Sequence, residues 1–346
     1  MTTRMAQEIV EQPAAVDRAL DGLLPLRPEL RRLAAGAREV LFVARGTSDN
    51  AAAYGRYLLE IHAGIAAALA APSLATHYRV ERDLSDTLVV SLSQSGGTNE
   101  IVETQAWAAE HGARTVAVTN QEDSPLAAAA DLTLALAAGP ELAVPATKTY
   151  TAQLVALAIL ADALGPHERS LEPHLRRVPG ELERVLAPTA ALDDAVGILD
   201  RADALLVSGR GLAHGTALEL ALKLEETNLR PVRGLSYADL RHGPIAVVDD
   251  SMAVVLVSAA DGPLTDDLTR LARDIRATGA ATVGIGGTPA FQSACSTVLP
   301  GPDLPETVAP IALIGPGQML AERLARHRGL DPDAPRGLTK VTQTDR

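Results

Sequence analysis

The strongest constraint on the fold is a regular alternation of two kinds of segment. Short runs rich in leucine and β-branched residues are separated by longer alanine-rich segments, and these runs are EVLFVA, TLVVSLS, RTVAVTN, LTLAL, ALLVSG, MAVVLVS, ATVGIGG and STVLP. Strands that alternate with helix-length segments are typical of parallel sheets covered by helices on both faces. The sequence therefore predicts the α/β class.

The chain also repeats itself. LFVARGTSDNAAAYGRYLLE (41–60) and LVSGRGLAHGTALELALKLE (206–225) follow one plan: a strand, an Arg-Gly turn, small or polar residues, and a long helix. The next strands correspond as well, because TLVVSLSQSGGT in the first half is matched by AVVLVSAADGPL in the second. We therefore expect two copies of one domain, each a parallel sheet flanked by helices.

Composition sets the expected boundaries. A segment rich in charges and prolines, GPHERSLEPHLRRVPGELERVLAPTAALDDA, separates the two copies and is typical of a linker. We expect five parts: an N-terminal helical segment (1–28), a first domain (29–165), the linker (166–195), a second domain (196–330) and a C-terminal tail (331–346).

Composition also argues against several classes of partner. Only 2% of residues are aromatic, which leaves little to stack on bases, and a net charge of -12 would repel a nucleic-acid backbone. Cys295 is the only cysteine, so we expect a buried, inert thiol and neither a disulfide framework nor a zinc cluster. The N-terminus has the pattern of an amphipathic helix, and no run of about 18 apolar residues occurs. We expect a cytoplasmic protein without nucleic-acid or membrane partners.

A polar loop, SLSQSGGTNE (91–100), directly follows a predicted buried strand. A parallel strand that ends in such a loop before a helix brings unpaired backbone N–H groups and the positive helix end to one point. The loop adds hydroxyls, an amide and two glycines that let the backbone approach a ligand: Ser93, Gln94, Ser95, Gly96, Gly97 and Thr98. We interpret it as a phosphate-binding loop, and an ordinary serine-rich turn with a helix cap is the alternative.

A second loop of matching chemistry, ARGTSDN, lies in the same copy. Its Thr47 and Ser48 also follow a strand and a glycine, so two hydroxyl-bearing loops at neighbouring strand ends could hold one phosphosugar. Neither GxxxxGK[ST] nor a full GxGxxG occurs, which argues against a nucleoside triphosphate or a dinucleotide.

A charged stripe marks the helix predicted in TALELALKLEETN. Glu219, Lys223 and Glu226 are spaced i, i+4, i+7 and share one face, whereas the rest of the circumference is mostly leucine and alanine except at Glu225. We expect this helix to be largely buried with the stripe facing a polar cavity, and a salt-bridge ladder on a solvated face is the alternative. Lys223 would hold the two carboxylates ionised, so Glu226 could serve as a general base.

Several motifs occur in the order of a known family: RGTSDN, SQSGGT, AVPATKTYTAQL, ALELALKLEET, RHGPIAVV and DPDAPRGLTKVTQT. They resemble the tandem sugar isomerase (SIS) domains of glucosamine-6-phosphate synthase, in a sequence that contains no glutaminase domain. The closing GLTKVTQT is more similar to the SIS-type, second class of glucosamine-6-phosphate deaminases. The resemblance covers roughly residues 5–344.

The resemblance implies roles for individual positions. It implies that the sugar phosphate is held by side chains of the two loops, namely Thr47, Ser93, Gln94, Ser95 and Thr98. Glu226 would move the proton between C1 and C2, and His242, otherwise a plausible turn residue before Gly-Pro, would assist ring opening and can reach the active site from the other subunit of a homodimer. Lys340 would contact the open-chain sugar, while Val144 and the turn 146–148, which includes Ala146 and Lys148, would line the site.

The resemblance also implies a reaction, with glucosamine 6-phosphate and water giving fructose 6-phosphate and ammonia. The C2 proton of an open-chain 2-amino aldose is acidic, so we expect the reaction to need neither a cofactor nor a metal. A fructosamine-6-phosphate deglycase and another aldose–ketose isomerase are alternatives. Where the family usually carries an HAEA-like run, this chain has Arg230 and Arg233, which would favour an extra carboxylate on the substrate if they faced the cavity. A non-enzymatic sugar-phosphate sensor is a further alternative.

Overall fold

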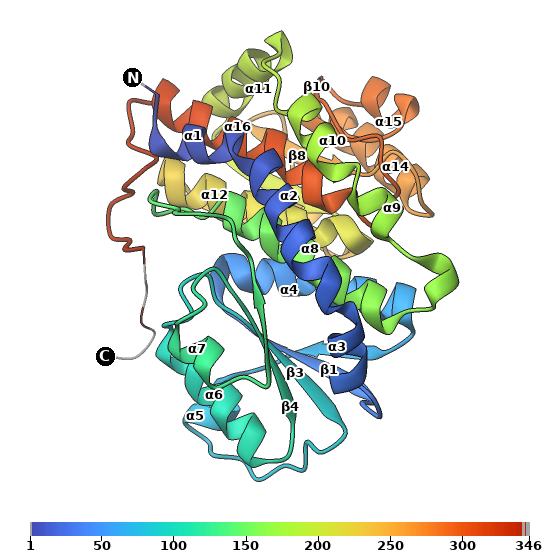
Figure 1. Cartoon of the computed structure of the whole chain (residues 1–346). Helices are drawn as coiled ribbons and strands as arrows, with labels where there is room; N and C mark the ends of the chain where they lie inside the picture. Colours follow the sequence, from blue (N-terminus) through green and yellow to red (C-terminus); the bar gives the residue numbers. More distant parts are fainter. Residues whose placement is uncertain (1, 341–342, 344–346) are drawn as a thin grey trace. The chain divides into compact units, whose positions relative to one another are not determined.

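The computed structural model describes residues 2–340 and 343 and divides into two compact units (Figure 1). The first-sheet unit comprises Ala14–Glu141, Lys148–Arg176 and Thr339–Arg346. The second-sheet unit comprises Met1–Pro13, Leu142–Thr147 and Arg177–Leu338. Each unit contains one five-stranded parallel sheet.

The first-sheet unit has the strand order β2-β1-β3-β4-β5. Its strands are β1 Glu39–Val43, β2 Ala66–Leu69, β3 Thr87–Leu92, β4 Arg114–Thr119 and β5 Leu132–Ala135. Its helices are α3 Arg27–Leu33, α4 Gly46–Leu58, α5 Ser73–Thr76, α6 Asn99–Glu110, α7 Pro125–Ala128, α8 Lys148–Leu164 and α9 Glu172–Leu175, with short η1 Leu24–Leu26, η2 Leu59–Ala63 and η3 His167–Arg169. Helix α2, Gln12–Leu23, begins in the second-sheet unit and continues into this one.

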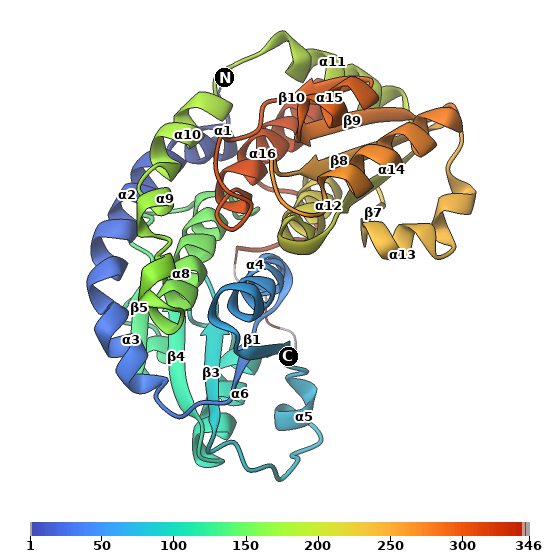
Figure 2. The ribbon, with the colours of Figure 1, turned by 90° about the vertical axis from the view of Figure 1, so that its right-hand side faces the viewer.

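Two layers of helix cover the first sheet. Helices α6 and α7 pack on one face, and α4 and α8 pack on the other with α3 against α8 (Figure 2). The α6 face buries aliphatic side chains of alternate strand positions, among them Leu41, Val43 and Val89, together with Ile101 of α6. Helix α8 is buried on nearly every side because its sequence is almost entirely apolar. Its one acidic residue, Asp162, is paired at 2.7 Å with Arg27 of α3.

The second-sheet unit repeats this design with the strand order β10-β9-β8-β6-β7. Its strands are β6 Ala204–Gly209, β7 Val232–Ser236, β8 Met252–Ser258, β9 Ala281–Gly286 and β10 Thr297–Leu299. Its helices are α1 Arg4–Val10, α10 Val178–Val185, α11 Ala190–Arg201, α12 His214–Asn228, α13 Tyr237–Arg241, α14 Thr265–Ala277, α15 Pro289–Ala294 and α16 Pro310–His327, with short η4 Gly211–Ala213 and η5 Pro244–Val247.

Helices α11, α12 and α16 pack on one face of the second sheet, and α13, α14 and α15 pack on the other (Figure 2). The core beneath α14 and α15 includes Cys295, whose buried position raises the pKa of its thiol to about 11. A thiol with so high a pKa is almost fully protonated at neutral pH and is a poor nucleophile. The prediction of a buried, inert cysteine is confirmed.

The predicted α/β class with two parallel sheets is confirmed. Each of the eight predicted strand segments forms a strand, and the two sheets share the flavodoxin-like order 2-1-3-4-5 when strands are numbered within each unit. The sequence analysis missed β2 and β7, which are both edge strands next to β1 and β6. Strand β2 consists of alanine and leucine, which are typical of helices, and β7 contains Arg233 and Gly234, so neither has the β-branched apolar run that marks a central parallel strand. No helix among the described residues combines the length and apolar character needed to cross a bilayer.

Candidate functional site

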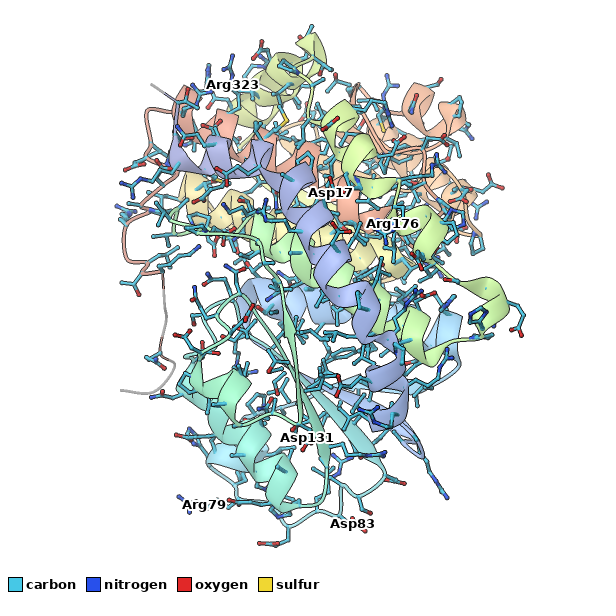
Figure 3. The ribbon with its side chains drawn as sticks, in the orientation of Figure 1. Asp17, Arg79, Asp83, Asp131, Arg176 and Arg323 are labelled. Atoms are coloured by element: carbon cyan, nitrogen blue, oxygen red, sulfur yellow. The ribbon has the colours of Figure 1, made fainter. Side chains whose placement is uncertain are left out.

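The two hydroxyl-bearing loops lie side by side at the carboxyl edge of the first sheet. Strands β1 and β3 are neighbours in parallel register, with Val43 opposite Ser91, so the loops that follow them leave the sheet at the same level. The strand order reverses between these two strands, and ligands of open α/β sheets bind at such a switch point. In Figure 3, Asp83 and Asp131 mark the opposite, amino edge of this sheet.

The loop after β3 is held in one shape by its own backbone. Gly96 has φ +60°, and a Cβ atom there would lie 2.1 Å from Oγ of Ser124, so only glycine fits. The carbonyl of Gly96 accepts from the backbone N–H of Leu126, and the carbonyl of Gln94 accepts from that of Asn120. These bonds fasten the loop to the segment that follows β4.

The same loop presents several hydrogen-bond donors. Oγ of Ser93 accepts from the N–H of Gly96 at 3.2 Å and lies 3.4 Å from Oγ1 of Thr98, and Oγ of Ser95 accepts from the N–H of Gly97 at 3.2 Å. Hydroxyls that already accept a bond still have a proton to donate. Helix α6 begins at Asn99, so its positive end adds to the attraction for an anion.

The loop after β1 offers fewer accessible hydroxyl groups than predicted. Gly46 takes a left-handed conformation at φ +54°, and the half-buried Thr47 follows it in the first turn of α4. Ser48 is buried, and its Oγ accepts a 2.9 Å hydrogen bond from Nε2 of Gln153 in α8. Part of the bonding capacity of Ser48 is therefore used inside the unit.

An ion pair that was not predicted joins the two loops. Arg45, at the start of α4, donates from Nε at 3.1 Å and from Nη2 at 2.8 Å to the two carboxylate oxygens of Glu100 in the first turn of α6. Glu100 is buried, and a bidentate arginine–carboxylate pair is directionally strict. The pair fixes the spacing of the two loops.

A buried carboxylate receives the tail lysine. Nζ of Lys340 lies 2.9 Å from Oε2 of Glu141, whose side chain is fully buried. Glu141 also accepts from the backbone N–H of Thr149 at 3.1 Å and from its Oγ1 at 2.6 Å. Lys148, the first residue of α8 and the sequence neighbour of Thr149, is buried. Glu141 was not predicted, although only Leu142 separates it from the AVPATK motif.

Two residues predicted to line the site belong to the second-sheet unit. The backbone N–H of Val144 donates to the carbonyl of Asp333 at 2.9 Å, and Asp333 in turn accepts from the first N–H groups of α1. Val144 and Ala146 are both half-buried. Their predicted roles remain predictions.

Helix α12 carries the charged stripe. Nζ of Lys223 lies 3.5 Å from Oε1 of Glu219 and 2.5 Å from Oε2 of Glu226, and the side chains of Glu219 and Lys223 are 0% and 1% exposed. The stripe is thus an ion-paired ladder, but Glu219 and Lys223 are buried, so the alternative of a ladder on a solvated face is wrong. Glu225 is exposed, as predicted, and its Oε1 accepts from the backbone N–H of Val232.

The burial of Glu219 and Lys223 limits the roles that this ion-paired ladder can have. Ionised groups inside a protein are costly unless each has a partner, and one ammonium between two carboxylates supplies a partner to both. Glu226 is the member with access to solvent, since its side chain is 21% exposed. An ionised, oriented and partly accessible carboxylate is what a general base requires.

His242 caps α13 and is exposed. Within the described part of the chain, no hydrogen bond or ion pair joins its ring to the stripe on α12. Arg230 donates to the carbonyls of Leu199 and Ala202 at the end of α11, and burial, together with the charge of Arg328, lowers its pKa. Arg233 is exposed on β7. Arg230 is therefore committed to a helix end within its own unit.

Together, the fold and these side chains define a two-domain α/β protein with a hydroxyl-rich loop at the switch point of one unit and a buried, ion-paired acid on a helix of the other. Among the described residues, no group of His, Cys, Asp or Glu side chains has the arrangement of a metal site. The SIS domain family model matches residues 34–163 and 198–296. The chain belongs to the SIS domain family, as the resemblance in its motifs implied.

Named relatives and solved structures agree with this assignment. The chain is 35% identical over 348 residues to the glutamine–fructose-6-phosphate aminotransferase [isomerizing] of Thermococcus kodakarensis, a match that covers 97% of this chain and 57% of the relative. It therefore spans little more than half the length of such relatives. The C-terminal domain of the glucosamine–fructose-6-phosphate aminotransferase of Francisella tularensis superposes with a TM-score of 0.88 at 27% identity, covering 97% of this chain and 99% of that one.

Two further structures have the same fold. A protein from Silicibacter pomeroyi, provisionally named a phosphosugar isomerase, gives a TM-score of 0.87 at 31% identity and covers 96% of this chain and 100% of its own. The glucosamine-6-phosphate deaminase of Thermotoga maritima gives 0.78 at 23% identity, covering 99% of this chain and 100% of its own. At that identity the second likeness concerns the fold alone.

Proposed function

We propose that this chain is a phosphosugar isomerase that acts on an amino-sugar phosphate, and that it works as a glucosamine-6-phosphate deaminase. The observation that carries the proposal is the buried pairing of Glu219 and Lys223 with the partly exposed Glu226. A structural helix of this apolar character has no need of two buried charges paired with a third, whereas a proton-transferring carboxylate needs such support.

The first-sheet unit would bind the phosphate. Hydroxyls of Ser93, Ser95 and Thr98 and the N-terminus of α6 converge at the switch point, which suits a dianion at the end of a sugar chain. The net attraction comes from donors that are already in place, because the loop is fixed by Gly96 and by the Arg45–Glu100 pair. A phosphate held at one end orients the carbon chain, which is catalysis by positioning.

Glu226 would carry the proton. In the open-chain amino aldose, Glu226 removes the C2 proton, the electrons of that C–H bond form a C1–C2 double bond, and the C1 carbonyl oxygen takes up a proton, giving an enolamine of the enediol type. Return of the proton from Glu226 to C1, as the amine gives up an N–H proton, leaves an imine at C2. Water adds to this imine and expels ammonia to give the ketose phosphate.

The names of relatives support a phosphosugar substrate. They include isomerizing aminotransferases that use fructose 6-phosphate and a protein provisionally named a phosphosugar isomerase. Arg230 gives no support to a deglycase that acts on a fructosyl amino acid 6-phosphate, because its guanidinium donates to backbone carbonyls at the end of α11. A sensor would have no use for the buried ladder on α12.

Ammonia release tests the proposal directly. Purified protein is given glucosamine 6-phosphate or a fructosyl amino acid 6-phosphate, and ammonia and fructose 6-phosphate are measured. In D2O, we expect deuterium at C1 of the fructose 6-phosphate. Ammonia from the second substrate alone would replace the deaminase by the deglycase, and tight binding of either compound without turnover or deuterium exchange would favour a sensor.

We also propose a homodimer in which His242 assists ring opening in the partner's active site. The exposed position of His242 on α13 is compatible with such a role. Mixing a Glu226→Gln chain with a His242→Asn chain tests it, because a mixed dimer would contain one site with both wild-type residues. Recovery of activity on mixing is expected, and its absence in a demonstrated mixed dimer would contradict the exchange.

A further inference from the structure

Gln343, near the C-terminus, contacts the loop after β3 that is proposed to bind phosphate (93–98). The resemblance to SIS proteins assigned no role to this side chain. Nε2 of Gln343 donates to the carbonyl of Gly97 at 3.0 Å, and its Oε1 accepts from the backbone N–H of Asn99 at 3.1 Å. One amide thus bonds to both sides of Thr98, the residue that precedes α6. The second bond satisfies one of the N–H groups at the beginning of that helix.

Three residues earlier, the same segment is held a second time. Lys340 pairs with Glu141 at 2.9 Å, and the lysine side chain is 26% exposed while the carboxylate is fully buried. A buried carboxylate is strongly destabilised without hydrogen bonds and a cation, and here Thr149 supplies two of the bonds and Lys340 supplies a cation. Glu141 therefore favours the state in which Lys340 is docked.

The two contacts lie within one unit and involve different chemistry. The Lys340 contact is an ion pair with the segment that leads into α8, and the Gln343 contact is a pair of neutral hydrogen bonds with the segment that leads into α6. The second contact is made by the backbone of the loop that would bind phosphate. Any ligand that fixes the conformation of Gly97–Asn99 therefore also fixes the docking surface for Gln343.

We propose that Glu141 and Gln343 are positioning residues for Lys340, and that binding of a phosphate group at Ser93–Thr98 stabilises the docked positions of Gln343 and Lys340. The proposal rests on the proposed function, in which Lys340 contacts the open-chain sugar. Because the coupling is thermodynamic, the docked segment must raise the affinity for phosphate by the same factor by which phosphate favours docking. Glu141 fixes where Nζ lies, and Gln343 makes that placement depend on an occupied phosphate site.

Amide hydrogen exchange on the full chain tests the docking without any turnover. Exchange is followed in peptides that cover residues 336–346 and 95–102, with and without inorganic phosphate. In the wild type, we expect phosphate to slow exchange in both peptides. In Gln343→Ala, phosphate should still protect the loop peptide but no longer the terminal one, and the Kd for phosphate should rise about fivefold. The matched control is Gln121→Ala, an exposed glutamine in the loop after β4, which should behave as wild type.

Kinetics separate the roles of the two residues. We expect Glu141→Gln to lower kcat for glucosamine 6-phosphate about tenfold or more with KM within about twofold, because Lys340 is misplaced while the phosphate loop is intact. Gln343→Ala should mainly raise KM. The double variant Glu141→Gln, Lys340→Met should have the same kcat as Lys340→Met alone, because Glu141 acts through the lysine. If Glu141→Gln does not fold, Glu141→Asp, with a shorter reach to Nζ, takes its place with the same expected fall in kcat.

Wild-type kcat in the Glu141 variant, or phosphate protection of the terminal peptide that survives in Gln343→Ala, would overturn the inference. A wild-type chain that turned over no sugar phosphate would instead remove the proposed function. The exchange experiment with inorganic phosphate would still decide whether Gln343 couples the terminal segment to the loop.

Discussion

In the first-sheet unit, strand β1 is followed by Arg45 and Gly46, and in the second-sheet unit, strand β6 is followed by Arg210 and Gly211. The two glycines have nearly the same left-handed conformation, with φ of +54° and +60°. The loops after β3 and β8 also share a left-handed glycine, Gly96 in one and Gly262 in the other. The two switch points thus have the same backbone plan.

Their side chains have opposite chemistry. Where the first unit has Ser93, Ser95 and Thr98, the second has Ala259, Asp261 and Leu264. Glu306 also packs against the loop after β8. Its backbone N–H donates to Asp261 at 2.7 Å, and its Oε2 lies where it would be 2.2 Å from a Cβ on Gly262. Burial, and then the charge of Asp261, raise the pKa of Glu306. The same backbone plan therefore carries hydroxyl groups in one unit and carboxylates in the other.

The helices after β1 and β6 differ in the complementary way. Helix α4 begins with hydroxyls and has Tyr54 and Leu58 where α12 has Glu219 and Lys223. The first copy therefore has its polar groups at the start of the helix, where they can meet a ligand's phosphate. The second copy has them along the helix, where they support one carboxylate. The two copies thus differ in the way that the proposed division of phosphate binding and proton transfer requires.

The largest effect expected from this division is at Glu226. Glu226→Gln keeps the shape of the side chain and removes its basicity, so we expect kcat to fall about 10²- to 10⁴-fold. KM should change little, because the phosphate is bound elsewhere. The control is Glu225→Gln, one residue away and exposed, which should keep activity near the wild-type level. Equal losses in the two variants would remove the assignment of Glu226.

Exchange of residues between the two switch points should have the next largest effect. Ser95→Asp places the acid of the second loop into the first, so we expect phosphate and sugar phosphate to bind about tenfold more weakly or worse, because like charges repel. The reciprocal change, Asp261→Ser, should leave the affinity unchanged. Binding is measured by isothermal titration calorimetry, and a similar loss in both variants would mean that the two loops are not divided as described.

The two left-handed glycines should differ in their tolerance of a methyl group. In Gly96→Ala, the new Cβ meets Ser124 at 2.1 Å and keeps an unfavourable φ, so we expect a loss of about 1–3 kcal/mol in the free energy of unfolding. Gly262→Ala meets the end of the half-buried Glu306 side chain, which can move aside. Its loss should be smaller. Chemical denaturation measures both, and a larger loss at Gly262 would contradict the fixed shape of the first loop.

The smallest effect expected is at Glu306. A carboxyl group whose pKa is raised on folding takes up protons in the folded state, so its contribution to stability falls as pH rises from the ordinary glutamate value through the raised one. Glu306→Gln removes this penalty, and we expect Tm at pH 7 to rise by about 2 °C or less. The gain should vanish at about pH 4, where the acid is protonated in both states. A gain that is the same at both values of pH would have another cause.

The sequence predicted the parts of the site that follow from local pattern. The hydroxyls and glycines at Ser93–Thr98 are contiguous, and the charged stripe of α12 is visible in the helical period, so both were found without a structure. The roles of His242 and Lys340 came from the resemblance to SIS proteins, and they remain predictions. The solvated alternative for the stripe was wrong because a helical period shows which residues share a face and not what covers that face.

By itself, the sequence determined the α/β class, the duplication and the positions of the polar loops, because strand and helix periods and glycine turns are local properties of a chain. Only the tertiary structure decided that Glu100 joins the two loops through Arg45, and that Arg230 donates to the carbonyls at the end of α11. It also decided that Gln343 bonds to the loop after β3 and that Lys340 pairs with Glu141. The Glu141–Lys340 pair joins residues 199 positions apart. A contact of that kind depends on how the sheet and its helices bring distant segments together, and a local pattern contains no information about it.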